Sequence, residues 1–470
     1  MLELPHAASV SLASGGGLTL DIFQKAFTRR RSPPKRRAHD GAEDLKFQSS
    51  LQEGSMFFSM LLSHVVHRGS LTVISANGRR REFGDGTGTP VTVRLHDKTV
   101  AHEMAFNPYL KLGEAYMDGR MTIDPPATIY DLLNVLTGNL GTKFAGPAFE
   151  LYGALRRAKR RIDQHNPVGK AQKNVAHHYD LDGGIYDLFL DKDKQYSCAY
   201  FQRPDMTLEE AQLAKKRHIA AKLRIEPGMR VLDIGCGWGG MALTLAEETG
   251  ADVVGVTLSK EQHKVATRRA EERGLSGQVE FRLQDYRSLK ENFDRVVSVG
   301  MFEHVGVGHF REYFDGVMKL LSHDGVALIH TIGRLDGPGS TNPWIAKYIF
   351  PGGYIPALSE MSGTVERSGL FMTDIEILRL HYAETLREWR RRFMEKRDTA
   401  ARIYDERFCR MWEFYLAGSE TSFRNEGMVV FQMQLAKQIA TLPLTRDYMV
   451  EDERQLNAEP QAQRRLLAGD

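Results

Sequence analysis

The chain has 470 residues, 42% of them hydrophobic, and a formal net charge of +3. This length predicts two or three domains, and the hydrophobic share is enough for a sizeable core. The small net charge gives no reason to expect a nucleic acid as partner. The three cysteines, Cys198, Cys236 and Cys409, are too widely spaced for a disulfide framework or a zinc ribbon, which favours a reducing, cytoplasmic compartment. No apolar run reaches the roughly 18 residues of a membrane-spanning helix, and no secretory signal is expected.

Residues 1–50 predict a disordered basic leader, because glycine, proline and basic residues leave little to bury. The basic clusters are Arg29–Arg31 and Lys35–Arg37. Two interpretations stay open. The clusters are either a solvated leader, or they attach the chain to anionic lipid, at about 1 kcal/mol per basic residue near the surface.

Residues 51–145 predict a small N-terminal α+β domain. Asn77-Gly78 separates two short apolar runs, 71–74 and 81–83, which is typical of a β-hairpin. The glycine-flanked segment Gly113–Gly119 is interpreted as rich in turns. The remaining elements are expected as a strand at 91–95 and as helices near 55–67 and 127–138.

Residues 146–170 predict a linker helix that carries a basic run, Arg156–Arg161. This run is either a solvated face or a contact with phospholipid headgroups, and the sequence favours neither. The main domain is expected at 171–450 and a C-terminal tail at 451–470.

Strands and helices alternate in the main domain. Strands are expected at 229–235, 252–258, 279–285, 293–300 and 325–333, and helices at about 207–223, 239–249, 260–273 and 310–321. This order predicts an α/β fold with a doubly wound, Rossmann-like parallel sheet and helices on both faces. Ligands of such a sheet bind beyond the carboxyl ends of its strands.

A glycine-rich loop, Gly235–Gly240, follows the first of these strands and permits a close backbone approach to a ligand. A nicotinamide cofactor would need an acidic residue about 20 positions further on, and 255–259 contains none. Asp233, within Leu-Asp-Ile-Gly-Cys-Gly, fits the pattern of class I methyltransferases instead. Asp285, at the end of the third strand, either accepts from an adenine amino group or caps a helix. The loop therefore predicts an S-adenosylmethionine site, and its Cys236 is expected to have no chemical part.

Further motifs resemble the cyclopropane-fatty-acyl-phospholipid synthase family, which includes the mycolic acid cyclopropane synthases. The resemblance runs from roughly 55 to 440 in matching order. Its motifs are His178–Asp180 (HYD), Tyr196–Phe201 (YSCAYF), Met206–Gln212 (MTLEEAQ), Val299–Gly306 (VGMFEHVG) and Leu328–Gly333 (LIHTIG).

The resemblance implies transfer of the sulfonium methyl group to a cis double bond of a phospholipid acyl chain. A carbocation forms, a bound bicarbonate removes a proton from the new methyl group, and a cyclopropane ring closes. The residues implied around the bicarbonate are Cys198 (backbone), Glu303, His330, Ile332 (backbone) and Tyr382. The residues expected around the cofactor are Tyr196, Ser197, Asp233, Gly235, Gly237, Gly239, Thr257, Ser259, Gln262, Asp285 and Tyr286.

Independently of the resemblance, Glu303 and His330 lie at or just after the ends of the fourth and fifth strands, on the ligand side of the sheet. The structural alternatives are a helix cap for Glu303 and, for His330, a core histidine that is hydrogen-bonded within the protein. Tyr382 could likewise be a core aromatic residue. His304 and His309 lack a third ligand nearby, so no metal site is expected.

One position departs from the family. Many relatives have a cysteine shortly before a Phe-Arg pair in the C-terminal helices, where this chain has Ser419. Either the cysteine is dispensable, or this protein is impaired. We favour the first, because attack by an alkene requires no activated thiol. Cys198 also has no adjacent base that would make it a nucleophile.

Residues 334–366 form an insert after the fifth strand, in which the aromatic stretch Trp344–Gly353 either packs as core or lines an acyl-chain tunnel. The arginines at 387 and 390–392 are expected on a solvated face. The expected partner is an unsaturated phospholipid, reached by peripheral association with the inner face of the membrane, and a homodimer stays open. The competing functions are a methyltransferase that yields methyl-branched or methylene acyl chains, a catalytically decayed lipid-binding scaffold and, more distantly, a dehydrogenase.

Overall fold

The computed structural model describes residues 54–140 and 184–458, all of which belong to one compact unit, Leu51–Asp470. The predicted leader (1–50), the linker helix (146–170) with its basic run Arg156–Arg161, and His178–Asp180 lie outside the described residues. Within the described ranges, no helix combines the length and the apolar character needed to cross a membrane.

The N-terminal region contains a four-stranded sheet in the order β2-β1-β3-β4. The expected hairpin about Asn77-Gly78 is confirmed, because β1 pairs antiparallel with β2 on either side of it. The expected third strand and both helical segments are also present. The strands are β1 (Ser70–Ile74), β2 (Arg80–Phe83), β3 (Pro90–Leu95) and β4 (Met121–Ile123). The helices cover 54–65, α3 (Val100–Phe106), α4 (Pro108–Met117) and α5 (Ile129–Leu140).

The turn predicted over Gly113–Gly119 is wrong, because residues up to Met117 belong to helix α4. Gly113 serves close packing rather than a turn. A Cβ atom at this position would lie 2.4 Å from Nε1 of Trp344, in helix α13 (Pro343–Tyr348). The glycine therefore lets α4 approach a segment far away in sequence, which local pattern alone does not reveal.

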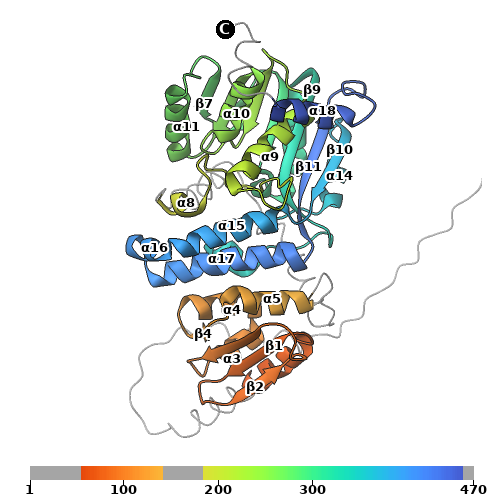
Figure 1. Ribbon diagram of the computed structural model, residues 1–470. Coiled ribbons are helices and arrows are strands. Elements are labelled where there is room, and N and C mark those ends of the chain that lie inside the picture. Colours follow the sequence, from red (N-terminus) through yellow and green to blue (C-terminus); the bar gives the residue numbers. More distant parts are fainter. Residues whose placement is uncertain (1–53, 141–183, 459–470) are drawn as a thin grey trace, which may run out of the picture. The chain divides into compact units, whose positions relative to one another are not determined.

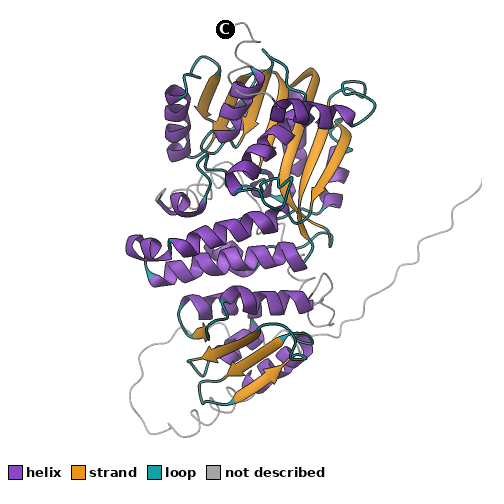
Figure 2. Ribbon diagram, in the orientation of Figure 1, coloured by secondary structure: helices purple, strands orange, loops and turns teal. Residues whose placement is uncertain are grey.

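The main domain contains a seven-stranded sheet in the order β10-β11-β9-β8-β5-β6-β7. Figure 2 shows its strands in orange with helices in purple beside them. Five strands were expected, and all five are found: β5 (Arg230–Ile234), β6 (Asp252–Thr257), β7 (Val279–Leu283), β8 (Phe293–Val299) and β9 (Leu321–Arg334). The other two are β10 (Phe371–Leu378) and β11 (Met428–Ala436).

The sequence predicted a parallel sheet, but the observed sheet is mixed. β11 is antiparallel to both of its neighbours, β9 and β10. Its nine residues are nearly all buried, so they lack the alternation of buried and exposed residues that marks a half-exposed strand. The fold remains the predicted Rossmann-like sheet, extended on one side by the reversed strand β11 and then by the edge strand β10.

Helices cover both faces of the sheet (Figure 1). One face packs against α9 (Leu208–Leu223), α10 (Gly240–Thr249) and α11 (Lys260–Glu272). The other packs against α12 (Phe310–Leu320) and α14 (Leu358–Val365). Alternate residues of each strand enter the two cores, as the pleat of a sheet requires.

The predicted C-terminal tail differs from the structure. Residues 451–458 continue helix α18 (Asp447–Ala458), which packs against α9, and 459–470 lie outside the described residues. The helix is tied down by polar contacts, because Glu453 accepts hydrogen bonds from His218 and Gln202.

A third core lies against α8 (Gly184–Phe189) and a group of helices, α15 (His381–Glu395), α16 (Arg397–Ile403) and α17 (Glu406–Asn425). α15 and α17 run side by side (Figure 1). The solvated face predicted for the arginines of α15 holds for Arg391, whose partners are on its own helix. It is wrong for Arg390 and Arg392, which bind Glu420 and Glu209 on other helices.

Candidate functional site

The glycine loop follows β5 and leads into α10. Gly235 (φ 81°) and Gly237 (φ 55°) adopt left-handed conformations that residues with a Cβ avoid. A Cβ at Gly235 would lie 3.0 Å from the side chain of Met301, whereas a Cβ at Gly237 would meet no atom within 4 Å. The backbone at Gly237 therefore faces open space, which a ligand can fill.

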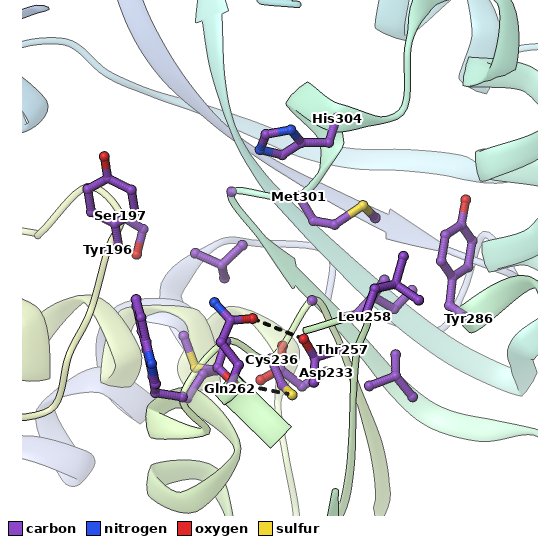
Figure 3. A pocket seen from close by; sticks show the side chains of 18 of the residues that line it. Tyr196, Ser197, Asp233, Cys236, Thr257, Leu258, Gln262, Tyr286, Met301 and His304 are labelled. Atoms are coloured by element: carbon purple, nitrogen blue, oxygen red, sulfur yellow. Dashed lines mark hydrogen bonds between the residues drawn. The ribbon is translucent and has the colours of Figure 1, made fainter. Parts of the chain in front are cut away.

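A pocket opens at this loop, beyond the carboxyl ends of the central strands (Figure 3). Nine of the expected cofactor residues line it: Tyr196, Ser197, Asp233, Gly235, Gly237, Thr257, Gln262, Asp285 and Tyr286. The walls also include residues that sequence reasoning missed as cofactor contacts: Trp238, Leu258, Gln284, Met301 and His304. Trp238, Leu258 and Gln284 are sequence neighbours of expected cofactor residues, so adjacency in sequence was the available signal for these three.

The two other expected cofactor residues have structural roles. Gly239 packs against β7, since a Cβ there would lie 2.6 Å from the ring of Phe281. Ser259 caps helix α11 by accepting the N–H of Gln262. The Thr257 hydroxyl donates to Oε1 of Gln262 across 2.9 Å, so the amide nitrogen of Gln262 is turned toward the pocket (Figure 3).

The pKa values of two carboxyl groups in the pocket, Asp233 and Asp285, are shifted in opposite directions. Burial raises the pKa of Asp233 to about 7, and its Oδ2 has no hydrogen-bond partner among the described residues. Burial also acts to raise the pKa of Asp285, but bonds from the side chain and N–H of Arg287 hold it below its ordinary value. Asp285 caps the short helix η1 (Tyr286–Ser288) as well as lining the pocket, so both of its predicted roles are compatible with the structure.

Glu303 lies on the short helix η2 (Phe302–His304), just after β8. Its Oε1 accepts the N–H of Ile332 across 2.7 Å. Its Oε2 is buried and makes no hydrogen bond with any described residue, and burial raises the pKa of the carboxyl to about 7. The N–H of Ile332 is already bonded to Glu303, so this hydrogen bond would have to break before the N–H could bind an anion.

His330 lies on β9, on the face that α9 covers, and is 2% exposed. Burial lowers the pKa of the imidazole well below its ordinary value. Nδ1 lies 3.2 Å from Nε2 of Gln432, while Nε2 of His330 is buried with no hydrogen-bond partner among the described residues. A backbone hydrogen bond links β9 to the segment just before η2, because the N–H of Gly300 donates to the carbonyl of His330.

Cys198 and Tyr382 lie on other elements. Burial raises the pKa of the Cys198 thiol, so it is no thiolate at neutral pH. The next residue, Ala199, donates its N–H to the hydroxyl of Thr385 on α15, the helix that also carries Tyr382. The Tyr382 ring packs against Trp389 and Phe423. None of the five residues expected around bicarbonate lines the cofactor pocket itself.

Sequence reasoning missed Lys215, a fully buried lysine of α9. Its Nζ donates to Oε1 of Gln195 (2.7 Å) and to Oγ of Ser197 (2.8 Å), both on the segment beside the pocket. Burial lowers the pKa of this amine to about 7. A lysine in a helix is normally exposed to solvent, so no sequence pattern indicated that Lys215 is buried.

His304 was considered only as a metal ligand, yet it is a wall of the pocket. Burial lowers the pKa of its imidazole to about 4, which keeps the ring neutral. His309 also lines the pocket and bonds to Glu312 across 2.8 Å. In the described parts of the chain, no group of three His, Cys, Asp or Glu residues is arranged to hold a metal ion.

Comparison with known proteins identifies two family matches. Residues 167–433 match the family described as mycolic acid cyclopropane synthetase, and residues 57–142 match a domain of unknown function. The chain is 38% identical over 348 residues to the cyclopropane-fatty-acyl-phospholipid synthase of Escherichia coli (strain K12), covering 74% of this chain and 88% of that protein. It is 37% identical over 357 residues to a probable fatty acid methyltransferase of Pseudomonas putida, covering 70% of this chain and 90% of that protein.

Among solved structures, the chain is similar to the mycolic acid cyclopropane synthase CmaA1 complexed with SAH and CTAB. The TM-score is 0.54 at 34% identity, and the match covers 58% of this chain and all (100%) of that one.

Proposed function

Because the chain belongs to the mycolic acid cyclopropane synthetase family, we propose that it is a cyclopropane-fatty-acyl-phospholipid synthase. It is an S-adenosylmethionine-dependent methyltransferase. In the proposed reaction it adds a methylene group to the cis double bond of an unsaturated phospholipid acyl chain. The observation that carries this proposal is a pair of buried polar atoms without partners among the described residues, Oε2 of Glu303 and Nε2 of His330, at the ligand edge of the sheet.

The pocket fits S-adenosylmethionine by its own geometry. The open space above Gly237 admits the ligand close to the backbone, and the amide nitrogen of Gln262 is available to a ligand acceptor. Asp285, held ionised by Arg287, can accept from an amino group. Bound S-adenosylmethionine supplies an electrophilic methyl group, and the chain's part is to orient it and exclude water.

A small anion such as bicarbonate is the ligand that we propose for Glu303 and His330. Buried polar groups are nearly always hydrogen-bonded, so the two open atoms of Glu303 and His330 call for a ligand. With a pKa near 7, the Glu303 carboxyl is partly protonated at neutral pH and can donate its proton to an anion rather than repel it. Bound bicarbonate would supply the base that takes the methyl proton.

An aromatic core stabilises positive charge in the proposed reaction. Tyr196 contacts the rings of Tyr186, Phe189 and Trp389, and Trp238 lies 5.0 Å from Tyr186. Aromatic faces attract cations, and the attraction grows when water is excluded. These side chains therefore suit both the sulfonium of the cofactor and a carbocation on the lipid.

Peripheral membrane association on the cytoplasmic face is part of the proposal. Four large apolar side chains of the small domain are exposed: Met56, Phe57, Met60 and Phe106. The rings of Phe57 and Phe106 stack with centroids 5.9 Å apart, so these residues form a local apolar surface. Such a surface supports attachment to a bilayer. A homodimer stays a prediction, for which analytical ultracentrifugation is the test.

A related function is the second candidate, because one relative carries the name probable fatty acid methyltransferase. It would leave a methylene product by loss of a proton from the same carbocation, or a methyl-branched product where a hydride donor reduces it. A decayed scaffold is disfavoured, since the chain retains Glu303, His330 and Tyr382. The test is incubation with S-adenosylmethionine, bicarbonate and vesicles of a monounsaturated phospholipid, followed by mass spectrometry of the lipids.

A gain of one CH2 with loss of the alkene supports cyclopropanation. The same gain with the alkene retained supports a methylene product, and a saturated methyl branch, formed when a hydride donor such as NADPH is added to the assay, supports the methyl-transfer alternative. Absence of any mass change, in a protein that binds S-adenosylmethionine, contradicts both enzymatic functions.

A further inference from the structure

A layer of buried polar side chains lies between helix α9 and the sheet. Lys222 and His218 of α9 are 3% and 7% exposed, and Gln432 of β11 is 1% exposed. Gln432 stands directly opposite His330 in the β9–β11 ladder, so both side chains point to the α9 face. Burial of this many polar groups costs free energy unless each has a defined partner.

The partners form one continuous chain of bonds. Nζ of Lys222 donates to Oε1 of Gln432 across 2.7 Å, and Nε2 of Gln432 lies 3.2 Å from Nδ1 of His330. Lys222 also binds Glu376, a residue of β10. Nε2 of His218 lies 2.7 Å from the same carboxylate, and its Nδ1 lies 3.0 Å from Glu453 of α18. The Nζ group of Lys222 is therefore held by Gln432 on one side and by the Glu376 carboxylate on the other.

Lys222 determines how the Gln432 amide is oriented. An ammonium group donates three hydrogen bonds and accepts none, so the atom that faces it must be the amide oxygen. The amide NH2 group then faces His330. A flipped amide would place its NH2 group against the ammonium and lose the bond from Lys222.

The oriented amide in turn determines the tautomer of His330. An NH2 group only donates, so Nδ1 of His330 must accept and cannot carry a proton. The imidazole is neutral, because burial and the nearby cations Lys215, Lys222 and His218 outweigh the carboxylate of Glu376. A neutral imidazole with a bare Nδ1 carries its proton on Nε2, the atom that has no partner among the described residues.

We propose that Lys222 and Gln432 are positioning residues that hold His330 as the Nε2–H tautomer, so that it presents a hydrogen-bond donor to a small anion. The identity of the anion as bicarbonate rests on the proposed function, whereas the tautomer does not. With the opposite tautomer, the lone pair of Nε2 would face the anion and repel it. The assignment gives β11 and β10, two strands that carry none of the expected site residues, a direct role at the site.

The test uses the full chain with ¹⁵N-labelled histidine. Nuclear magnetic resonance distinguishes protonated from bare imidazole nitrogens, and a His330→Gln chain identifies the signals of His330. The expected result for the unaltered protein is a protonated Nε2 and a bare Nδ1. A protonated Nδ1 overturns the proposal, and this outcome is read from the unaltered protein once a folded His330→Gln chain has identified the signals.

Gln432→Glu is the informative variant, because a carboxylate of nearly the same shape accepts from both Lys222 and His330. It should move the proton of His330 to Nδ1, weaken the dependence on bicarbonate, and reduce turnover by about tenfold or more. The affinity for S-adenosylmethionine, measured by calorimetry, should stay unchanged. Retention of the Nε2–H tautomer in a folded Gln432→Glu protein would overturn the proposal.

Gln434→Met is the matched control. Gln434 lies two residues away on the same face of β11, is equally buried, and bonds to Lys222's carbonyl and Tyr448 rather than to His330. Its loss should leave the His330 signals unchanged. If the tautomer behaves as expected but no lipid is modified, the positioning role stands and the proposed function fails.

Discussion

The N–H of Ile332 donates to Oε1 of Glu303 across 2.7 Å, so the two oxygens of that carboxyl have different surroundings. One oxygen is tied to the backbone of β9, while the other is buried and has no partner among the described residues. The bond also fixes the direction in which Oε2 faces. A protein rarely leaves such an atom unpaired without a functional reason, and the carboxyl is the centre of the first prediction.

Glu303→Gln should lower kcat by about 100-fold or more, because an amide cannot exchange a proton with a bound anion. The glutamine retains an oxygen for the N–H of Ile332, so the fold should survive. The measurement is turnover of unsaturated phospholipid, with cofactor affinity by calorimetry as the control. Normal turnover in this variant would show that the anion site is assigned wrongly.

The same substitution should make the free protein more stable at alkaline pH. Burial raises the folded pKa of Glu303 to about 7, above its value in the unfolded chain. The folded state therefore binds the proton more tightly, and this contribution is fully present below about pH 4.5 and lost as the pH rises through 7. The stability gained by Glu303→Gln should grow between pH 5 and pH 8 in urea unfolding. A gain that is independent of pH would contradict the raised pKa.

Cys198→Ala should retain most activity. Burial raises the pKa of the thiol, and the expected role of Cys198 uses its backbone, which alanine keeps. The loss of a buried sulfur should cost on the order of 1 kcal/mol of unfolding free energy. Steady-state kinetics beside thermal unfolding will separate the two effects. Loss of turnover in a stable Cys198→Ala protein would require a chemical role for the thiol.

Gly237→Ala should weaken S-adenosylmethionine binding by about tenfold or more, because its methyl group would occupy the space that the ligand needs. Gly274→Ala is the matched control. Gly274 also has a positive φ, 68°, and a Cβ there would likewise meet no atom within 4 Å, but it lies outside the pocket. Both variants should lose about 1 kcal/mol of stability from backbone strain. Equal cofactor affinities in the two would exclude the loop from the cofactor site.

Glu114→Gln should loosen the contact between α4 and α13. Glu114 accepts bonds from Lys111 (2.8 Å), Lys347 (2.6 Å) and Tyr348 (2.9 Å). Burial alone would raise the pKa of Glu114, yet these bonds lower it to about 2.

The stability contributed by Glu114 is therefore present above about pH 4.5 and is lost as the pH falls toward 2. In urea unfolding, the variant should be less stable by about 1–3 kcal/mol at pH 7, and the difference should shrink in acid. Glu82→Gln, which alters an exposed pair with Arg80, is the control and should change little. An equal effect of both variants would contradict the role of burial at Glu114.

The local features of this protein could be predicted from the sequence. The alternation of strands and helices predicted five strands of the main sheet, and Asn77-Gly78 predicted the hairpin, because each depends on a short stretch of chain. The glycine loop with Asp233 predicted the cofactor pocket, since a strand, its turn and the following helix form one local unit. Glu303 and His330 were predicted at the ligand edge, because parallel strands bring their carboxyl ends together.

The tertiary structure decided what depends on contacts between distant segments. β11 reverses direction and brings Gln432 to His330, although 102 positions separate them in the chain. Lys215 and Lys222 can be buried because distant segments supply their acceptors, Gln195 and Ser197 for the first and Gln432 of β11 for the second, which no helical pattern encodes. Gly113 lies in a helix rather than a turn because Trp344 packs against it. Local hydrogen bonding and hydrophobic periodicity determined the elements and the pocket loop, whereas the partners of the buried polar groups were settled only when non-local packing brought them within hydrogen-bond distance.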